Sequence, residues 1–218
     1  MLKIRHSALL NIRMELNTMK TKYSFYALIS RMKNITRWTL MRNSTPENIQ
    51  EHSHMVAVIA HALAVIRRDV LGGEADPGLA AAMGLFHDSS EIFTGDMPTP
   101  IKYYDTKIME AYKKVESVAS RKLLSALPLE LRPEYKKLLS PGKDNDMVIL
   151  VKAADRISAY IKCIEELKAG NLEFRHAAEQ SKEKLISMGL PEVEYFLDNF
   201  IHAFELTLDE LDFSFDAE

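Results

Sequence analysis

Two long segments of the sequence repeat apolar residues every three or four positions, which is the spacing of one face of an α-helix. Their members are Ile108, Tyr112, Val115, Ala119 and Leu123 in the first and Leu150, Ala154, Ile157, Ile161 and Ile164 in the second. Gly170 follows the second stripe, at the place where a helix is expected to stop. No segment of the sequence alternates apolar and polar residues as a half-buried strand does. The sequence therefore predicts an all-α fold.

Turn-forming residues divide the rest of the sequence into further helices and two loops. Helices are expected at 23–35, 51–70, 77–93, 172–188 and 191–206. Loops are expected at 36–48 and 94–100, where Asn, Ser, Thr, Gly and Pro gather. Because loops between rigid elements often carry functional residues, both are candidate parts of a site.

The length and charge of the chain limit its organisation and its partners. A chain of 218 residues suits one well-buried core and is short for two. We expect an N-terminal extension at 1–22, a globular domain at 23–206 and an acidic tail at 207–218. The net charge of -3 argues against a nucleic-acid polymer as partner, because surfaces that follow phosphates are usually basic.

The cysteine content and hydropathy suggest a cytoplasmic protein. Only one cysteine is present, Cys163, so an intrachain disulfide is excluded and no oxidising compartment is required. No uninterrupted apolar run approaches the roughly 18 to 20 residues of a membrane-spanning helix. The densest apolar stretch, 55–66, is interrupted by His61. A membrane partner is therefore not expected.

The adjacent pair His87-Asp88 is the strongest chemical signal. Glu91 follows within four residues, so on a helix it would share a face with this pair. His52 opens another predicted helix, and Asp155 lies beside Ala154 of the second stripe, where an unpaired carboxylate would be costly. Two imidazoles and two carboxylates suit a divalent first-row cation and leave positions for water or a phosphate oxygen. Taken alone, the pair could equally cap a buried helix.

The order His52, His87-Asp88 and Asp155 resembles the metal-binding pattern of the HD-domain phosphohydrolase superfamily. Members of this superfamily fold as helical bundles, so the resemblance implies an HD-domain helical bundle. A narrower resemblance, over about 23–211, is to the bacterial YfbR-like 5′-deoxynucleotidases. The stretches that carry it are Arg37-Trp38, 47–53 (ENIQEHS), 87–91 (HDSSE), 94–100 (TGDMPTP) and 160–167 (YIKCIEEL).

This resemblance implies a homodimeric enzyme that hydrolyses deoxynucleoside 5′-monophosphates to deoxynucleosides and phosphate. It implies that a divalent cation such as Co²⁺ or Mn²⁺ is bound by four residues, namely His52, His87, Asp88 and Asp155. Glu91 occupies the position of the carboxylate that activates the attacking water, and a surface acid is the alternative. Arg37 matches the arginine that orients the phosphate, for which its fork of donors is suited.

The resemblance also implies a set of substrate contacts. Trp38 would close on the deoxyribose, where a bulky indole could exclude a ribose 2′-hydroxyl; a core anchor is the alternative. Asp96 would accept a hydrogen bond from the sugar 3′-hydroxyl, and a solvated turn is the alternative. The remaining substrate contacts would be His52, Asp88, Asp155, Met97, Pro98 and Thr99.

Two other functions stay open at the level of the sequence. A related phosphohydrolase could act on a nucleoside triphosphate, a cyclic nucleotide or a guanosine alarmone, although longer polyphosphates usually call for more basic residues than Arg37 and its neighbours. A non-catalytic metal or nucleotide sensor could keep the fold. A sensor has no need of the base at Glu91, which favours an enzyme.

Overall fold

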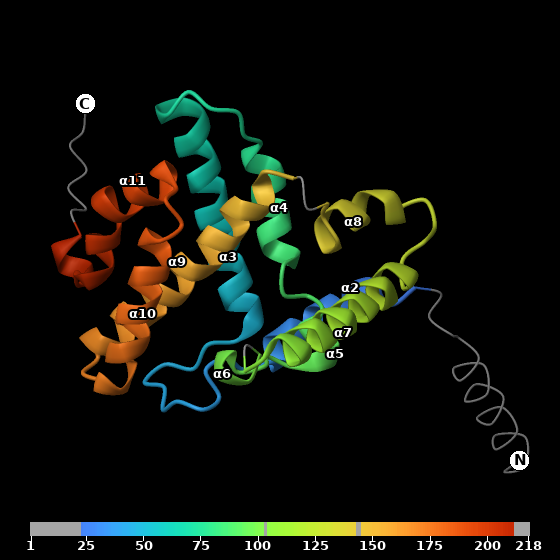
Figure 1. The fold of residues 1–218 in the computed structure, drawn as a ribbon, viewed down its shortest axis with the longest axis horizontal. Helices are drawn as coiled ribbons and strands as arrows, with labels where there is room; N and C mark the ends of the chain where they lie inside the picture. The colour runs from blue at the N-terminus through green and yellow to red at the C-terminus, as the bar shows by residue number, and fades with distance from the viewer. Residues whose placement is uncertain (1–22, 103, 143–144, 212–218) are drawn as a thin grey trace, which may run out of the picture.

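The computed structural model describes residues 23–102, 104–142 and 145–211. Within these residues the elements of regular secondary structure are helices (Figure 1). The first half contains α2 (Phe25–Ile29), η1 (Ser30–Asn34), α3 (Ile49–Val65), η2 (Ile66–Val70), α4 (Pro77–Phe86), α5 (Glu91–Thr94) and α6 (Thr99–Lys102). The second half contains α7 (Thr106–Ser125), α8 (Arg132–Leu139), α9 (Met147–Lys168), η3 (Leu172–Phe174), α10 (Arg175–Ile186), α11 (Pro191–Asn199), η4 (Ile201–Glu205) and η5 (Leu208–Glu210). Among the described residues, β-type pairing is limited to one bridge between Thr36 and Asn48.

The core forms where α3, α4 and α9 pack against one another, and Figure 1 shows α4 beside α3 and α9 crossing α3. Its fully buried side chains include Val56, Ala60, Leu63, Ala80, Leu150, Ala153, Ala154 and Ile157. Gly84 allows the close approach of α4 to α3, because a Cβ there would lie 2.7 Å from the Cα of Ala57. The three helices that meet here carry His52, Asp155 and, just beyond the end of α4, His87.

Two smaller clusters fix the segments around this core. Phe25, Leu123 and Leu127 are buried together and join α2 to α7, with Phe86 packed against them. Cys163 and Phe174 are buried in the other cluster, which joins α9 to the loop that carries Trp38. Both clusters therefore border the elements that hold the candidate site residues.

The second apolar stripe is confirmed as a buried helix face, because all five of its members are buried in α9. The helix stops as expected before Gly170, whose φ is +82°. The first stripe lies on α7, but only Tyr112, Ala119 and Leu123 are buried. Ile108 and Val115 are exposed because α7 lies at the edge of the molecule, where neighbouring helices cover one side (Figure 1).

The predicted single helix at 77–93 is wrong at 87–90, because α4 ends at Phe86 and the separate helix α5 begins at Glu91. The chain makes tight turns through 87–90, in which the backbone N–H of Ser89 donates to the carbonyl of Phe86 and that of Glu91 donates to Asp88. The hydroxyl of Ser89 also donates to the carbonyl of Phe86 over 2.7 Å. Such local side-chain bonds compete with the helical pattern and end the helix.

Several other boundaries also differ from the prediction. The expected helices at 23–35, 172–188 and 191–206 each divide into an α-helix and a 3-10 segment, and 51–70 ends in the π-helical turn η2. The expected loop at 94–100 gives way to α6 from Thr99, and α8 was not predicted. The predicted extension at 1–22 and residues 212–218 of the predicted tail lie outside the described residues.

In the part of the chain that the structure describes, one helical stretch meets the length and composition of a membrane span. It runs over Ile49–Val70, and 56% of its most apolar window is buried inside the fold. The core helix of a globular protein passes the same test, and α3 packs against both α4 and α9. This stretch is therefore accounted for by the core.

Candidate functional site

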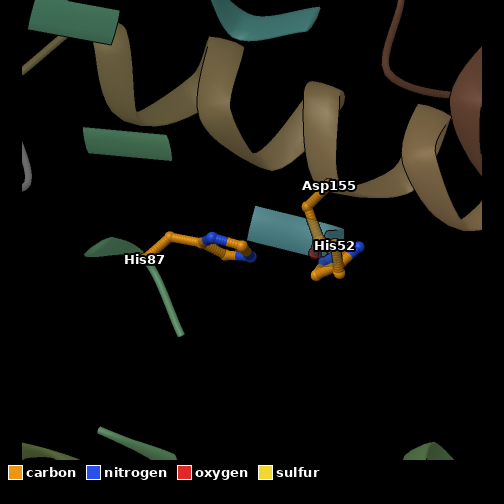
Figure 2. Close-up of side chains that lie close together, drawn as sticks. All are labelled: His52, His87 and Asp155. Carbon is orange, nitrogen blue, oxygen red and sulfur yellow. The ribbon is translucent and has the colours of Figure 1, made fainter. Parts of the chain in front are cut away.

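Three side chains that could bind a metal ion converge from three separate segments. His52 comes from the first turn of α3, His87 from the turn after α4, and Asp155 from the middle of α9. One ligand atom from each lies within 4.8 Å of the others. Figure 2 shows the ring of His87 pointing toward His52 and Asp155. The structure thus brings together residues separated by up to 103 positions.

Contacts of the Nδ1 atoms with neighbouring polar groups orient both imidazole rings. His52 is fully buried, with Nδ1 3.1 Å from the hydroxyl of Ser158 and Nε2 3.1 Å from Oδ1 of Asp155. Nδ1 of His87 lies 2.8 Å from the carbonyl of Gly84, to which it can donate. A histidine that donates one nitrogen to a backbone carbonyl keeps the other available as a metal ligand. Nε2 of His87 is buried and has no hydrogen-bond partner of acceptable geometry.

Asp88 lies beside this group and connects it to Arg37. Its Oδ2 is 3.0 Å from Nε2 of His87, 3.7 Å from Nε2 of His52 and 3.6 Å from Nη1 of Arg37. Burial opposes ionisation of Asp88, but the charges of His87, His52 and Arg37 outweigh it and lower its pKa. Asp88 is therefore an anion that faces both the histidines and the arginine.

The cluster attracts positive charge. Burial alone would lower the pKa of His87, but the charges of Asp88 and Asp155 outweigh burial and raise it to about 9. For Asp155, burial is likewise outweighed by the hydrogen bond and charge of His52 and the charge of His87, so its pKa is lowered. A divalent cation would compete with protons for this negative site.

Glu91 is the buried first residue of α5, and its Oε2 has no hydrogen-bond partner. Burial, followed by the charges of Asp88 and Asp96, raises the pKa of Glu91 to about 9. A cation close by would act in the opposite direction and favour the ionised carboxylate. The surface position considered from the sequence does not apply, since the side chain faces the interior.

Arg37 and Trp38 lie in the loop between η1 and α3. Nε of Arg37 and Nε1 of Trp38 both donate to Oε2 of Glu47, over 3.0 Å and 3.1 Å. The indole packs against Phe174 with ring centroids 5.3 Å apart. Trp38 has a φ of +58°, and among the described residues other than glycine this positive value is unique.

The loop predicted at 94–100 to contact substrate begins one residue later, at Gly95, because Thr94 is the last residue of α5. Gly95 has a φ of +70°. Asp96, Met97 and Pro98 are half-buried, and the side chain of Thr99 lies outside the described part of the chain. Burial raises the pKa of Asp96, while the positive charge of Arg37 acts against that rise. Asp96 is thus within electrostatic reach of Arg37 rather than fully solvated.

Two residues near the site were given no role from the sequence. Ser158 lies three positions after Asp155 on α9, so the shared helix face was a usable signal. Glu47 lies ten positions after Arg37 across a loop, and no sequence rule links such positions.

Comparisons with known proteins agree with the resemblance carried by these residues. Residues 24–204 match the family described as 5′-deoxynucleotidase YfbR-like. A 5′-deoxynucleotidase of Photobacterium profundum is 50% identical over 191 residues, which are 87% of this chain and 98% of that relative. A 5′-deoxynucleotidase of Vibrio cholerae is 48% identical over 188 residues, which are 86% of this chain and 97% of that relative.

A solved structure of an HD-domain phosphohydrolase from Listeria innocua has a similar fold. The TM-score is 0.72 at 25% sequence identity, and the match covers 83% of this chain and 88% of that chain. The all-α HD-domain fold predicted from the sequence is therefore confirmed.

Proposed function

The chain belongs to the YfbR-like family of 5′-deoxynucleotidases, and we propose that the cluster around His52, His87 and Asp155 is the centre at which it hydrolyses its substrate. It is a phosphoric monoester hydrolase that converts deoxynucleoside 5′-monophosphates to deoxynucleosides and phosphate. The observation that carries the assignment of the site is the convergence of these three side chains within 4.8 Å.

The donor set fits a divalent cation. Two imidazoles and the carboxylate of Asp155 converge, and the carboxylate of Asp88 lies 3.0 Å from Nε2 of His87, which makes no hydrogen bond of acceptable geometry. We assign the cation, which could be Co²⁺, Mn²⁺ or a similar ion, to His52, His87, Asp88 and Asp155. When bound, it would supply positive charge to a phosphate oxygen and to the attacking water. The same side chains, except His87, would also border the substrate.

Arg37 and Glu91 are the proposed catalytic side chains. The terminal nitrogens of Arg37 would hold phosphate oxygens, because its Nε is already engaged by Glu47. Oε2 of Glu91 would accept a proton from the attacking water. Its lack of a hydrogen-bond partner supports this role, since a buried carboxylate oxygen without a partner is uncommon outside functional sites.

The sugar would lie between Trp38 and the loop of Asp96, Met97, Pro98 and Thr99. Asp96 would accept a hydrogen bond from the 3′-hydroxyl, and the indole of Trp38 would exclude a 2′-hydroxyl. The strained backbone of Trp38 supports a functional role, because such conformations persist where the surroundings impose them. Because the indole would exclude the 2′-hydroxyl, we expect Trp38→Ala to gain cleavage of ribonucleotides. An unchanged preference for deoxynucleotides over ribonucleotides would count against exclusion by the indole.

The assembly and the location of the protein are also proposals. Exposed apolar residues on α7, namely Ile108, Val115 and Val118, would suit a homodimer interface.

We take 23–206 as the catalytic domain, which the family match over 24–204 supports, with 1–22 and 207–218 as flanking segments. The net charge and the single cysteine support a cytoplasmic enzyme that acts on nucleotides and on neither nucleic-acid polymers nor membranes.

The test is phosphate release from deoxy- and ribonucleoside 5′-monophosphates by the purified full chain, after removal of metal and readdition of Co²⁺, Mn²⁺ or Mg²⁺. We expect cation-dependent hydrolysis of the deoxy substrates. Turnover confined to nucleoside triphosphates, cyclic nucleotides or alarmones would favour another phosphohydrolase. Stoichiometric metal binding without turnover of any substrate would favour a sensor.

A further inference from the structure

One carboxylate oxygen joins the residue proposed to hold the phosphate to the residue proposed to exclude ribose. Oε2 of Glu47 accepts hydrogen bonds from Nε of Arg37 and from Nε1 of Trp38, at 3.0 Å and 3.1 Å. The side chain of Glu47 is only 16% exposed, and that of Arg37 only 12%. Hydrogen bonds to a poorly solvated carboxylate are stronger than those between neutral groups.

The backbone around Trp38 needs such support. A bulky residue at a φ of +58° is unfavourable unless its neighbours hold it in place. The carbonyl of Trp38 accepts hydrogen bonds from the backbone N–H of Met41 and from Nδ2 of Asn43, over 2.9 Å and 3.2 Å. These bonds fix the main chain, whereas the bond to Glu47 fixes the polar edge of the indole.

Glu47 is itself held at the base of the loop. The backbone N–H of Arg37 donates to the carbonyl of Glu47 over 2.9 Å, beside the bridge between Thr36 and Asn48. The tip of the loop is anchored separately, because the backbone N–H groups of Ser44 and Thr45 donate to the buried carboxylate of Glu166 on α9. The loop therefore keeps its course without the side chain of Glu47, which leaves that side chain free to act on Arg37 and Trp38.

We propose that Glu47 is a positioning residue that sets sugar selectivity by fixing the guanidinium of Arg37 and the indole of Trp38 relative to each other. This inference rests on the proposed function. The guanidinium fixes where the phosphate lies, and the indole fixes the wall that the sugar meets. Since the two ends of a nucleotide are covalently linked, a 2′-hydroxyl clashes only when both protein groups keep this fixed spacing.

The experiment compares Glu47→Ala and Glu47→Gln with the wild type in the full-length protein. The first measurement is the ratio of kcat/KM for deoxyadenosine 5′-monophosphate to that for adenosine 5′-monophosphate. The second is the fluorescence of Trp38, which is the single tryptophan of the chain and so reports its own environment. Bound metal and melting temperature are measured in parallel.

We expect Glu47→Ala to lower the selectivity ratio about tenfold or more, the factor for losing a hydrogen bond to a charged group. The emission of Trp38 should shift to the red and be quenched more readily by acrylamide, while the metal content stays unchanged. Glu47→Gln should give intermediate values, because glutamine keeps an acceptor oxygen but loses the charge.

A matched control is Glu192→Gln, which removes the charge from another arginine–glutamate pair. There Nε of Arg67 on η2 donates to Oε1 of Glu192 on α11 over 2.9 Å, outside the cluster in which Trp38 packs against Cys163 and Phe174. This control should lower stability while leaving selectivity and Trp38 emission unchanged.

If the wild type is selective and the Glu47→Ala variant is equally selective, the role of Glu47 is overturned while the proposed function stands. Altered selectivity with unchanged Trp38 emission would also overturn that role. A wild type that hydrolyses neither nucleotide would overturn the proposed function together with it.

Discussion

The contact of α4 with α3 at Gly84 leads to a prediction with a defined magnitude. In Gly84→Ala the new Cβ would lie 2.7 Å from Cα and 2.9 Å from N of Ala57, whereas ordinary contacts begin at 3.4 Å. Both atoms belong to the backbone, so a change of side-chain rotamer cannot relieve the overlap. The two helices must move apart by about 0.7 Å, the difference between 3.4 and 2.7 Å.

The expected loss of stability follows from two opposing contributions. Overpacking of a core costs about 1–3 kcal/mol, and an overlap with backbone belongs at the upper end of that range. Alanine recovers up to about 1 kcal/mol over glycine inside a helix. The net loss in the free energy of unfolding is therefore about 2 kcal/mol, which lowers Tm by about 4–8 °C for a chain of this length.

The same helix provides the control. Gly78 also lies in α4, but a Cβ there would meet its nearest atom, Oδ1 of Asp76, at an ordinary 3.4 Å. Gly78→Ala should therefore leave Tm unchanged or raise it slightly. Thermal unfolding followed by circular dichroism measures both variants. Equal melting temperatures for Gly84→Ala and the wild type would refute the argument from close packing.

Gly84→Ala should also weaken metal binding, because the carbonyl of Gly84 accepts the hydrogen bond from Nδ1 of His87. Displacing a group that orients a metal ligand typically reduces affinity about 10–100-fold. Titration of the metal-free protein with Co²⁺ measures this effect. Wild-type affinity in a destabilised variant would show that His87 does not depend on the position of α4.

Three further predictions concern single side chains at the site. Glu91→Gln should lower kcat about 10²–10⁴-fold while the metal stays bound, and an active variant would remove Glu91 as the base. Arg37→Lys should raise KM for deoxynucleotides more than it lowers kcat, because lysine lacks the paired donors; an unchanged KM would exclude the phosphate contact. Ser158→Ala should weaken metal affinity about 10–100-fold, because it removes the hydroxyl that contacts Nδ1 of His52. Equilibrium dialysis against a chelator measures the affinity, and a variant that retains metal as well as the wild type would exclude a role of Ser158 in orienting His52.

The sequence was informative where a pattern is local and repeated. The stripe that became α9 predicted both the helix and its buried face, because a long helix that packs against α3, α4 and α10 buries a continuous stripe. The stripe on α7 predicted a helix but not the exposure of Val115, since exposure depends on which neighbours cover the helix. The short helix α8 was missed because its apolar residues are too few to form a stripe.

The candidate site was predictable as a set of residues and not as an arrangement. Spacing and resemblance selected His52, His87, Asp88 and Asp155, and the structure brings their side chains together. The contacts of Glu47 were not predictable, because they depend on the course of a loop fixed by Glu166 on α9, more than a hundred positions away. Tertiary contacts of this kind leave no periodic trace in a sequence.

The chain leaves the α-helical hydrogen-bond pattern at 87–90, where His87 and Asp88 reach the site. Adjacent side chains on a helical backbone point about 100° apart, so His87 and Asp88 approach the site from different directions. In the tight turns after α4, Oδ2 of Asp88 lies 3.0 Å from Nε2 of His87 and also 3.6 Å from Nη1 of Arg37. Ser89, by donating to the carbonyl of Phe86, favours this turn over another helical turn. Two adjacent residues thus serve one site, because Asp88 lies between the imidazole of His87 and the guanidinium of Arg37.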